Sequence, residues 1–166
     1  MSKLNNLKDL FTHLLQDMYF AENKIKAELP KMAEKATNPK LKKGFEKHLE
    51  ETKDQISKLE KVFEITGIEK DKEKCEAILG LLEEGKGLIK ESAEGAVRDS
   101  ALIAAAQKVE HYEIASYGML CNMGKLLGYN DAAEILHEIL EQEKATDEKL
   151  TSMCDAIEEE AMKKAA

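Results

Sequence analysis

The chain has 166 residues, of which 43% are hydrophobic and 35% charged, and its net charge is −8. This composition is typical of a soluble globular protein, and it excludes an intrinsically disordered chain. The negative charge, without a dense basic cluster, argues against nucleic acid as a partner. No run approaches the ~18 apolar residues of a transmembrane helix, so we expect no membrane partner either.

The N-terminal part of the chain predicts two helices joined by a short turn. The apolar spacing favours a first helix from about Leu4 to about Lys35, with a kink or break at Pro30. Asn38 and Pro39 are typical of a helix start, and the second helix should run from Pro39 to about Ile65 and end at Gly67.

The C-terminal part predicts a second helical hairpin after a long connection. Glycines interrupt residues 68–95, so we expect one or two short helices there. Two further long helices should follow, from about Ala96 to Leu127 and from about Asn130 to Ala161. Two antiparallel hairpins joined by a long crossover predict an all-α, ferritin-like four-helix bundle, a single domain over residues 1–166.

Each of the four long helices carries polar residues in the middle of its apolar face. They are Glu22 on the first helix, His48 and Glu51 on the second, Glu110 and Glu113 on the third, and Glu143 and Asp147 on the fourth. Residues three or four apart share a helix face. Counted from the hairpin turns at ~1.5 Å per residue, the carboxylates should form a layer within roughly 8 Å, with His48 one turn outside it.

Such a layer of acidic side chains needs positive charge. A buried, unpaired carboxylate costs several kcal/mol unless it is protonated or meets a cation. Arg98, the sole arginine, should lie about 18 Å from Glu110 along the helix. The pattern therefore predicts two divalent metal ions, with iron expected and manganese as the alternative, because carboxylate-rich sites with few imidazoles suit these metals.

Four segments resemble the YciF/YciE family of ferritin-like stress proteins. They are DLFTHLLQDMYFAE (9–22), HLEET (48–52), DSALIAAAQKVEHYEIASYG (99–118) and LEQEKATDEKL (140–150). The resemblance implies a four-helix bundle, a dimetal site, a tendency to dimerise and a link to stress responses; it supplies no reaction. Better-known di-iron bundles use Glu-x-x-His twice, whereas here the order is His48-x-x-Glu51 and the fourth helix offers no histidine at the site.

Two hypotheses from different classes follow. The first is a cytoplasmic, homodimeric protein whose metal pair reduces dioxygen or peroxide or oxidises ferrous iron, with Glu51 and Glu113 as bridging ligands and the other five as terminal ligands. The widely spaced Cys75, Cys121 and Cys154 fit reduced thiols in that compartment. The rival is a non-enzymatic stress or assembly protein whose vestigial carboxylate layer holds water, protons or adventitious calcium or magnesium. Iron storage in a shell is a third possibility.

Two neighbouring side chains have open roles. Tyr117 lies one turn after Glu113 and is a candidate to support the site or take part in redox chemistry, or simply to pack. His111 should point about 100° away from the apolar face, so we expect it to bond nearby backbone or lie at a subunit contact rather than bind metal.

Overall fold

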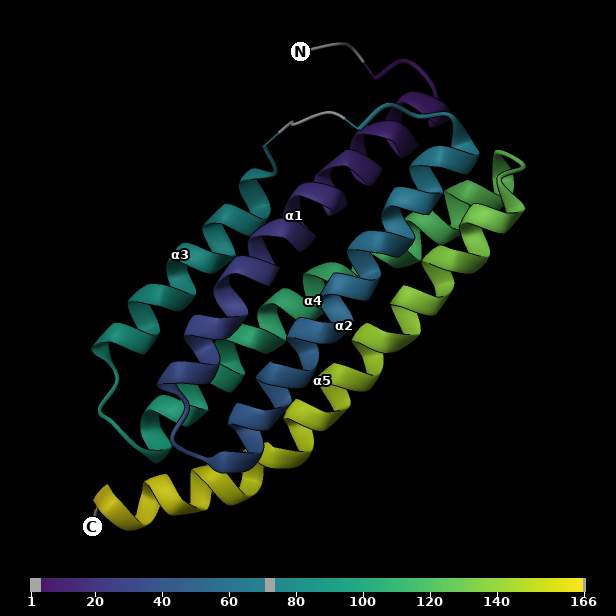
Figure 1. Cartoon of the computed structure of the whole chain (residues 1–166). Helices are drawn as coiled ribbons and strands as arrows, with labels where there is room; N and C mark the ends of the chain where they lie inside the picture. Colours follow the sequence, from purple (N-terminus) through teal and green to yellow (C-terminus); the bar gives the residue numbers. More distant parts are fainter. Residues whose placement is uncertain (1–3, 71–73, 166) are drawn as a thin grey trace.

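The computed structural model describes residues 4–70 and 74–165, and all its regular elements are helices (Figure 1). In chain order they are α1 (Leu7–Lys35), α2 (Pro39–Thr66), α3 (Glu76–Glu91), α4 (Ala96–Leu126) and α5 (Asn130–Ala165). Among the described residues, no helix is both long and apolar enough to cross a membrane.

The local signals in the sequence set most helix ends. The side chain of Asn38 accepts hydrogen bonds from the amides of Lys40 and Leu41, and Gly67 ends α2 at a φ of 67°. A side chain at that φ would be strained, which explains the glycine. The first helix begins at Leu7, capped by Asn6, rather than at Leu4.

Of the kink or break predicted at Pro30, the break is wrong, because α1 continues through this residue to Lys35. Proline removes one backbone hydrogen bond and crowds the preceding turn. Leu29 and Ala33 are both buried, so packing on either side of Pro30 holds the last turns in place.

The crossover contains one helix, α3, of 16 residues. It runs through Gly80, Gly85 and Gly87, which therefore do not interrupt it. It lies outside the four long helices, against α4 and, to a lesser extent, α1 (Figure 1).

The four long helices pack pairwise in a closed ring in which α1 contacts α2 and α4, and α5 contacts α2 and α4. The turn between α1 and α2 lies at the end of the molecule where α4 begins, and the α4–α5 turn lies at the opposite end (Figure 1). Asp99, in the first turn of α4, accepts hydrogen bonds from the backbone amides of Thr37 and Asn38, both at 2.8 Å, and from the Thr37 hydroxyl. This buried carboxylate thus ties the first hairpin to α4.

The hydrophobic core consists of two clusters rather than one. Phe11, Leu15 and Leu120 belong to the cluster nearer the α4–α5 turn. Leu29 and Leu102 belong to the cluster nearer the α1–α2 turn. Between the two clusters lies a layer of buried polar side chains: Glu22, His48, Thr52, Gln55, Glu110, Glu113, Glu143 and Thr146.

Candidate metal centre

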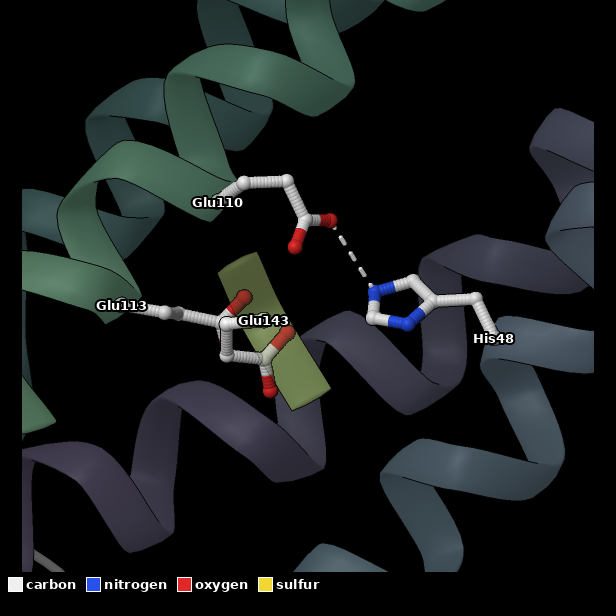
Figure 2. Close-up of side chains that lie close together, drawn as sticks. All are labelled: His48, Glu110, Glu113 and Glu143. Atoms are coloured by element: carbon white, nitrogen blue, oxygen red, sulfur yellow. Dashed lines mark ion pairs between the residues drawn. The ribbon is translucent and has the colours of Figure 1, made fainter. Parts of the chain in front are cut away.

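Four buried side chains converge in the polar layer. His48 of α2, Glu110 and Glu113 of α4, and Glu143 of α5 each place one potential ligand atom within 4.8 Å of the others (Figure 2). His48 Nε2 lies 3.2 Å from Glu110 Oε1. All four residues are at most 4% exposed. Three helices therefore deliver one imidazole and three carboxylates to a single point.

Glu22 of α1 joins this group from the remaining long helix. It is fully buried, and its Oε1 accepts a short hydrogen bond from the Tyr117 hydroxyl. Its carboxyl group also lies close enough to that of Glu113 for each to affect the pKa of the other. Tyr117, itself fully buried, therefore supports a carboxylate at the site.

The charges in this layer affect one another. Burial raises the pKa of Glu22 to about 7, even though the bond from Tyr117 and the charge of His48 lower it. Burial also raises the pKa of Glu113 and of Glu143 well above the usual range, and neighbouring carboxylates push both further up. Burial alone would lower the pKa of His48, but the contact with Glu110 outweighs it and raises that pKa. Without a metal ion, the layer therefore holds protons.

Several buried polar atoms of this cluster have no hydrogen-bond partner among the described residues. They are one oxygen each of Glu22, Glu110 and Glu113, both oxygens of Glu143, and both ring nitrogens of His48. The contact between His48 Nε2 and Glu110 is an ion pair by distance but lacks hydrogen-bond geometry. Since buried polar groups are almost always paired, such a concentration of unpaired oxygen and nitrogen atoms fits a bound cation that accepts their lone pairs.

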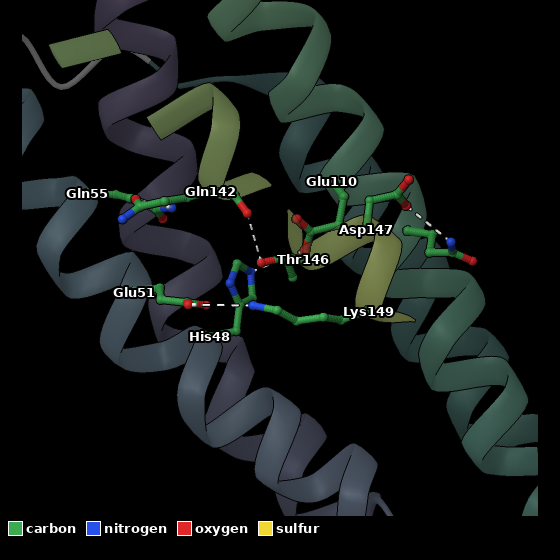
Figure 3. Close-up of polar contacts among 9 residues, drawn as sticks. His48, Glu51, Gln55, Glu110, Gln142, Thr146, Asp147 and Lys149 are labelled. Atoms are coloured by element: carbon green, nitrogen blue, oxygen red, sulfur yellow. Dashed lines mark hydrogen bonds and ion pairs between the residues drawn. The ribbon is translucent and has the colours of Figure 1, made fainter. Parts of the chain in front are cut away.

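The structure places Glu51 and Asp147 at the edge of the layer rather than within the cluster (Figure 3). Glu51 pairs with Lys47 at 2.8 Å and with Lys149 at 3.9 Å. Asp147 pairs with the exposed His111 at 3.3 Å and accepts a hydrogen bond from Gln107 at 3.1 Å. Both carboxylates are about one-fifth exposed and already have partners of their own. Their role as ligands stays a prediction.

A polar side-chain pair completes the layer between α2 and α5. The Gln55 amide donates to Gln142 Oε1 at 3.2 Å, and the Thr146 hydroxyl donates to the backbone carbonyl of Gln142 (Figure 3). Gln55 and Thr52 interrupt the apolar face of α2, so the sequence pattern indicates that they belong to the layer. It does not indicate this for Gln142, which lies beside Glu143 at the edge of the α5 face. Only the hydrogen bond from Gln55 shows that Gln142 belongs to the layer.

The predicted height of His48 differs from the observed one for a topological reason. The predicted height is a distance from the hairpin turn of each helix, but the two turns lie at opposite ends of the molecule (Figure 1). The carboxylates still meet because they lie near the middle of their helices. Measured from the end shared by Thr37 and Asp99, His48 and Glu110 each lie eleven residues along their helices and therefore stand at about the same height.

Fold and site together define a class: an all-helical protein whose core is divided by a buried carboxylate and histidine cluster. Residues 6–163 match the family described as "Domain of unknown function (DUF892)". The chain is 49% identical to Protein YciF of Escherichia coli (strain K12) over 151 residues, covering 90% of this chain and 91% of YciF. The chain therefore belongs to the DUF892 family. Its relative YciF is described as a stress protein of E. coli.

Solved structures agree with this assignment. The crystal structure of the E. coli stress protein YciF matches with a TM-score of 0.90 at 46% identity, covering 93% of this chain and 98% of that one. YcfI of Rhodopseudomonas palustris, for which a structural role has been suggested, matches with a TM-score of 0.87 at 43% identity. The match covers 90% of this chain and 95% of that one. A Xanthomonas campestris protein, 22% identical with a TM-score of 0.77, shows the fold alone and covers 96% and 99%.

Proposed function

We propose that this protein is a ferritin-like four-helix bundle that binds two divalent metal ions, iron in the first place, in the polar layer of its core. The convergence of His48, Glu110, Glu113 and Glu143 within 4.8 Å carries this proposal. With Glu22 added, four buried carboxylates face two divalent charges, so the charge balance favours a pair of ions over one. Oxygen-rich ligand sets with one imidazole favour iron or manganese.

The residues have distinct tasks in this proposal. His48, Glu22, Glu110, Glu113 and Glu143 hold the ions, and Glu113 and Glu143 give up protons as the ions enter. Glu51 and Asp147 complete the ligand set only by leaving Lys47 and His111 and turning inward. The Tyr117 hydroxyl orients Glu22. Bound iron would supply redox chemistry toward dioxygen, peroxide or ferrous iron at this site.

The test is metal analysis of protein loaded with ferrous iron under argon and then exposed to air. We expect two iron ions to remain per chain and a charge-transfer absorbance to develop in the near ultraviolet. Glu113→Ala should lose both, whereas Glu148→Ala, an exposed change on α5, should keep both. Wild-type protein that retains no iron, or a Glu113→Ala variant that retains it fully, would contradict the proposal.

A non-enzymatic structural or assembly role in stress is the second candidate, and two observations favour it. A structural role has been suggested for the relative YcfI. The raised carboxyl pKa values also mean that protons can neutralise the layer without metal. Thermal melts separate the candidates, because a ligand that binds only the folded state raises the melting temperature as its concentration grows. A melting temperature indifferent to iron and manganese would favour the structural role.

We also propose a location and an assembly state for the protein. We place the protein in the cytoplasm as one domain spanning residues 1–166, and as a homodimer, because two-fold assemblies are the commonest. Its free cysteines fit a reducing compartment. Neither nucleic acid nor a membrane enters the proposal, and the partners are iron and a small oxidant.

A further inference from the structure

A cavity of about 440 Å³ opens between α1, α3 and α4 and reaches the metal centre. His48 and Glu110 line its inner end, so the buried cluster borders this space. Small-molecule sites typically have volumes of ~300–1,000 Å³, and this cavity falls in that range. The crossover helix α3 forms its outer wall.

The walls of the cavity are mostly apolar. Leu29 of α1, Leu82 of α3 and Val109 of α4 line it, together with further aliphatic side chains of the same helices. Leu82 is half-buried, and the other two are at most 8% exposed. An aliphatic lining of this kind stabilises an apolar ligand through the surface that both remove from water.

The mouth of the cavity is basic although the whole chain is acidic. Its cations are Lys31, Lys35, Lys86, Lys90 and Arg98. The carboxylates at the same rim are Glu28, which pairs with Lys31 and Lys86, and Glu94, which pairs with Arg98.

The rim therefore has more positive than negative charge. Lys35 and Lys90 have no ion-pair partner among the described residues. These groups can receive an anion without first releasing a carboxylate.

The two kinds of lining lie at opposite ends. Arg98 and Glu110 are both on α4, twelve residues apart, or about 18 Å along the axis at 1.5 Å per residue. Lys35 is likewise at the end of α1 nearest Arg98, and Ile25 is deeper. A ligand that fills this space therefore needs a negative head at the rim and an apolar body beyond it. The inner carboxylate, Glu110, disfavours the reverse orientation.

We propose that this cavity binds a single-chain, long-chain carboxylate, with its carboxylate among the lysines and Arg98 at the rim and its alkyl chain directed toward His48 and Glu110. The binding itself needs no metal. The alkyl chain is thereby presented to the metal pair, so long-chain carboxylates are the substrate class. This second step rests on the proposed function.

Calorimetric titration with three probes, each below its micellar concentration, tests the binding. Dodecanoate should bind with one site per chain. Hexanoate should bind at least roughly a hundredfold more weakly, because each methylene group contributes about fourfold in affinity. Dodecyltrimethylammonium, with the same chain and a positive head, should bind at least about tenfold more weakly than dodecanoate.

Matched variants locate the site. Leu82→Trp fills the cavity and should weaken dodecanoate at least roughly tenfold, whereas Leu88→Trp, on the same helix but outside the lining, should not. Lys35→Glu with Lys90→Glu should weaken dodecanoate by a similar factor. Lys61→Glu with Lys125→Glu, exposed near the opposite end, should leave its affinity unchanged. The surface lysine changes keep the test valid even where the tryptophan disturbs folding.

Running the titrations with and without bound iron separates the two proposals. Dodecanoate binding that persists in metal-free protein supports the cavity proposal even if iron binding fails. The cavity proposal is overturned if dodecanoate does not bind, if the cationic probe binds equally well, or if Lys35→Glu with Lys90→Glu has no effect.

Discussion

At the scale of single residues, the stability of the polar layer depends on how its buried carboxyl groups are neutralised. Glu113 and Glu143 are buried beside other carboxylates, and burial raises the pKa of each well above the usual range. Glu22 is held by Tyr117, whose hydrogen bond keeps its pKa from rising further than about 7. Protons and cations therefore compete for the same oxygens, and substitutions can distinguish the effect of proton binding on stability from that of metal binding.

Glu113→Gln should stabilise the metal-free protein and at the same time abolish its stabilisation by metal. The amide keeps the size of the side chain but cannot ionise, so the metal-free variant at pH 8 avoids both a buried charge and the free-energy cost of protonating Glu113 in the folded state. We expect its free energy of unfolding to rise by about 1–3 kcal/mol. The gain in melting temperature on adding iron should disappear.

The measurement is chemical denaturation in a chelating buffer, followed by melts with ferrous iron under argon. Glu148→Gln, an exposed change on α5, is the control and should alter neither quantity. A metal-free Glu113→Gln variant that is less stable than wild type at pH 8 would contradict the buried-charge interpretation.

Tyr117→Phe should act through Glu22. Removing the hydroxyl deletes the bond that lowers the pKa of Glu22, so that pKa should rise above about 7. Carbon NMR of labelled glutamate side chains measures it directly. We also expect a loss of about 1–2 kcal/mol in stability at pH 8, since one oxygen of Glu22 loses its donor. Tyr129→Phe is the matched control, and an unchanged Glu22 titration in Tyr117→Phe would refute the link.

At the scale of secondary-structure elements, short local signals set the helix ends, and a few tertiary contacts set how the helices meet. Asn38, Pro39 and Gly67 were sufficient to predict both ends of α2 within a residue. The break expected at Pro30 did not occur, because burial of Leu29 and Ala33 outweighs the local cost of proline. The role of Asp99 was not predicted, since its partners lie 61 and 62 residues away and leave no periodic trace.

Asp99→Asn tests this tertiary contact. The carboxylate accepts from two backbone amides and one hydroxyl. An asparagine side chain would turn an NH₂ group toward one of these donors and leave it unpaired. We expect the free energy of unfolding to fall by about 2–4 kcal/mol. Asp155→Asn, on the exposed surface of α5, should change it by less than about 0.5 kcal/mol. Equal effects of the two changes would show that the tie between α4 and the first hairpin contributes little.

Two glycine substitutions should have opposite signs. Gly67→Ala places a side chain at a φ of 67° and should destabilise by about 1 kcal/mol. Gly80 lies within α3, is exposed, and has open space where a Cβ would stand, so Gly80→Ala should stabilise by about 0.5–1 kcal/mol. Urea denaturation of both variants is the measurement. A stabilising Gly67→Ala would show that the left-handed cap is unimportant.

At the scale of the whole molecule, the polar layer joins two apolar clusters that each pack as an ordinary core. The interrupted apolar faces predicted this layer, because each helix carries its own gap in the sequence. The pairing of individual members could not be predicted, since it depends on helix direction and on the opposite placement of the two turns. The partly exposed positions of Glu51 and Asp147 likewise depend on Lys47, Lys149 and His111, which periodicity does not place.

Because this layer lies at the junction of the two clusters, global stability should depend on pH in opposite ways with and without metal. The folded-state pKa values of Glu22, Glu113, Glu143 and His48 are all raised, so the folded chain binds more protons than the unfolded one. Stability is then fully present below the unfolded carboxyl pKa and is lost as pH rises, through about 7 for Glu22.

Metal-free protein should therefore unfold more easily at pH 8 than at pH 5.5, with Glu22 alone contributing roughly 2 kcal/mol over this range. Iron or manganese, which displaces these protons, should stabilise more as pH rises, so the gap between metal-loaded and metal-free melting temperatures should widen. Calorimetric melts from pH 5.5 to 8, with chelator or with metal under argon, measure both curves. If the metal-free curve is flat or rises with pH, the carboxyl groups are not held as proton carriers in the folded core, and the competition between protons and metal that underlies the proposed site does not operate.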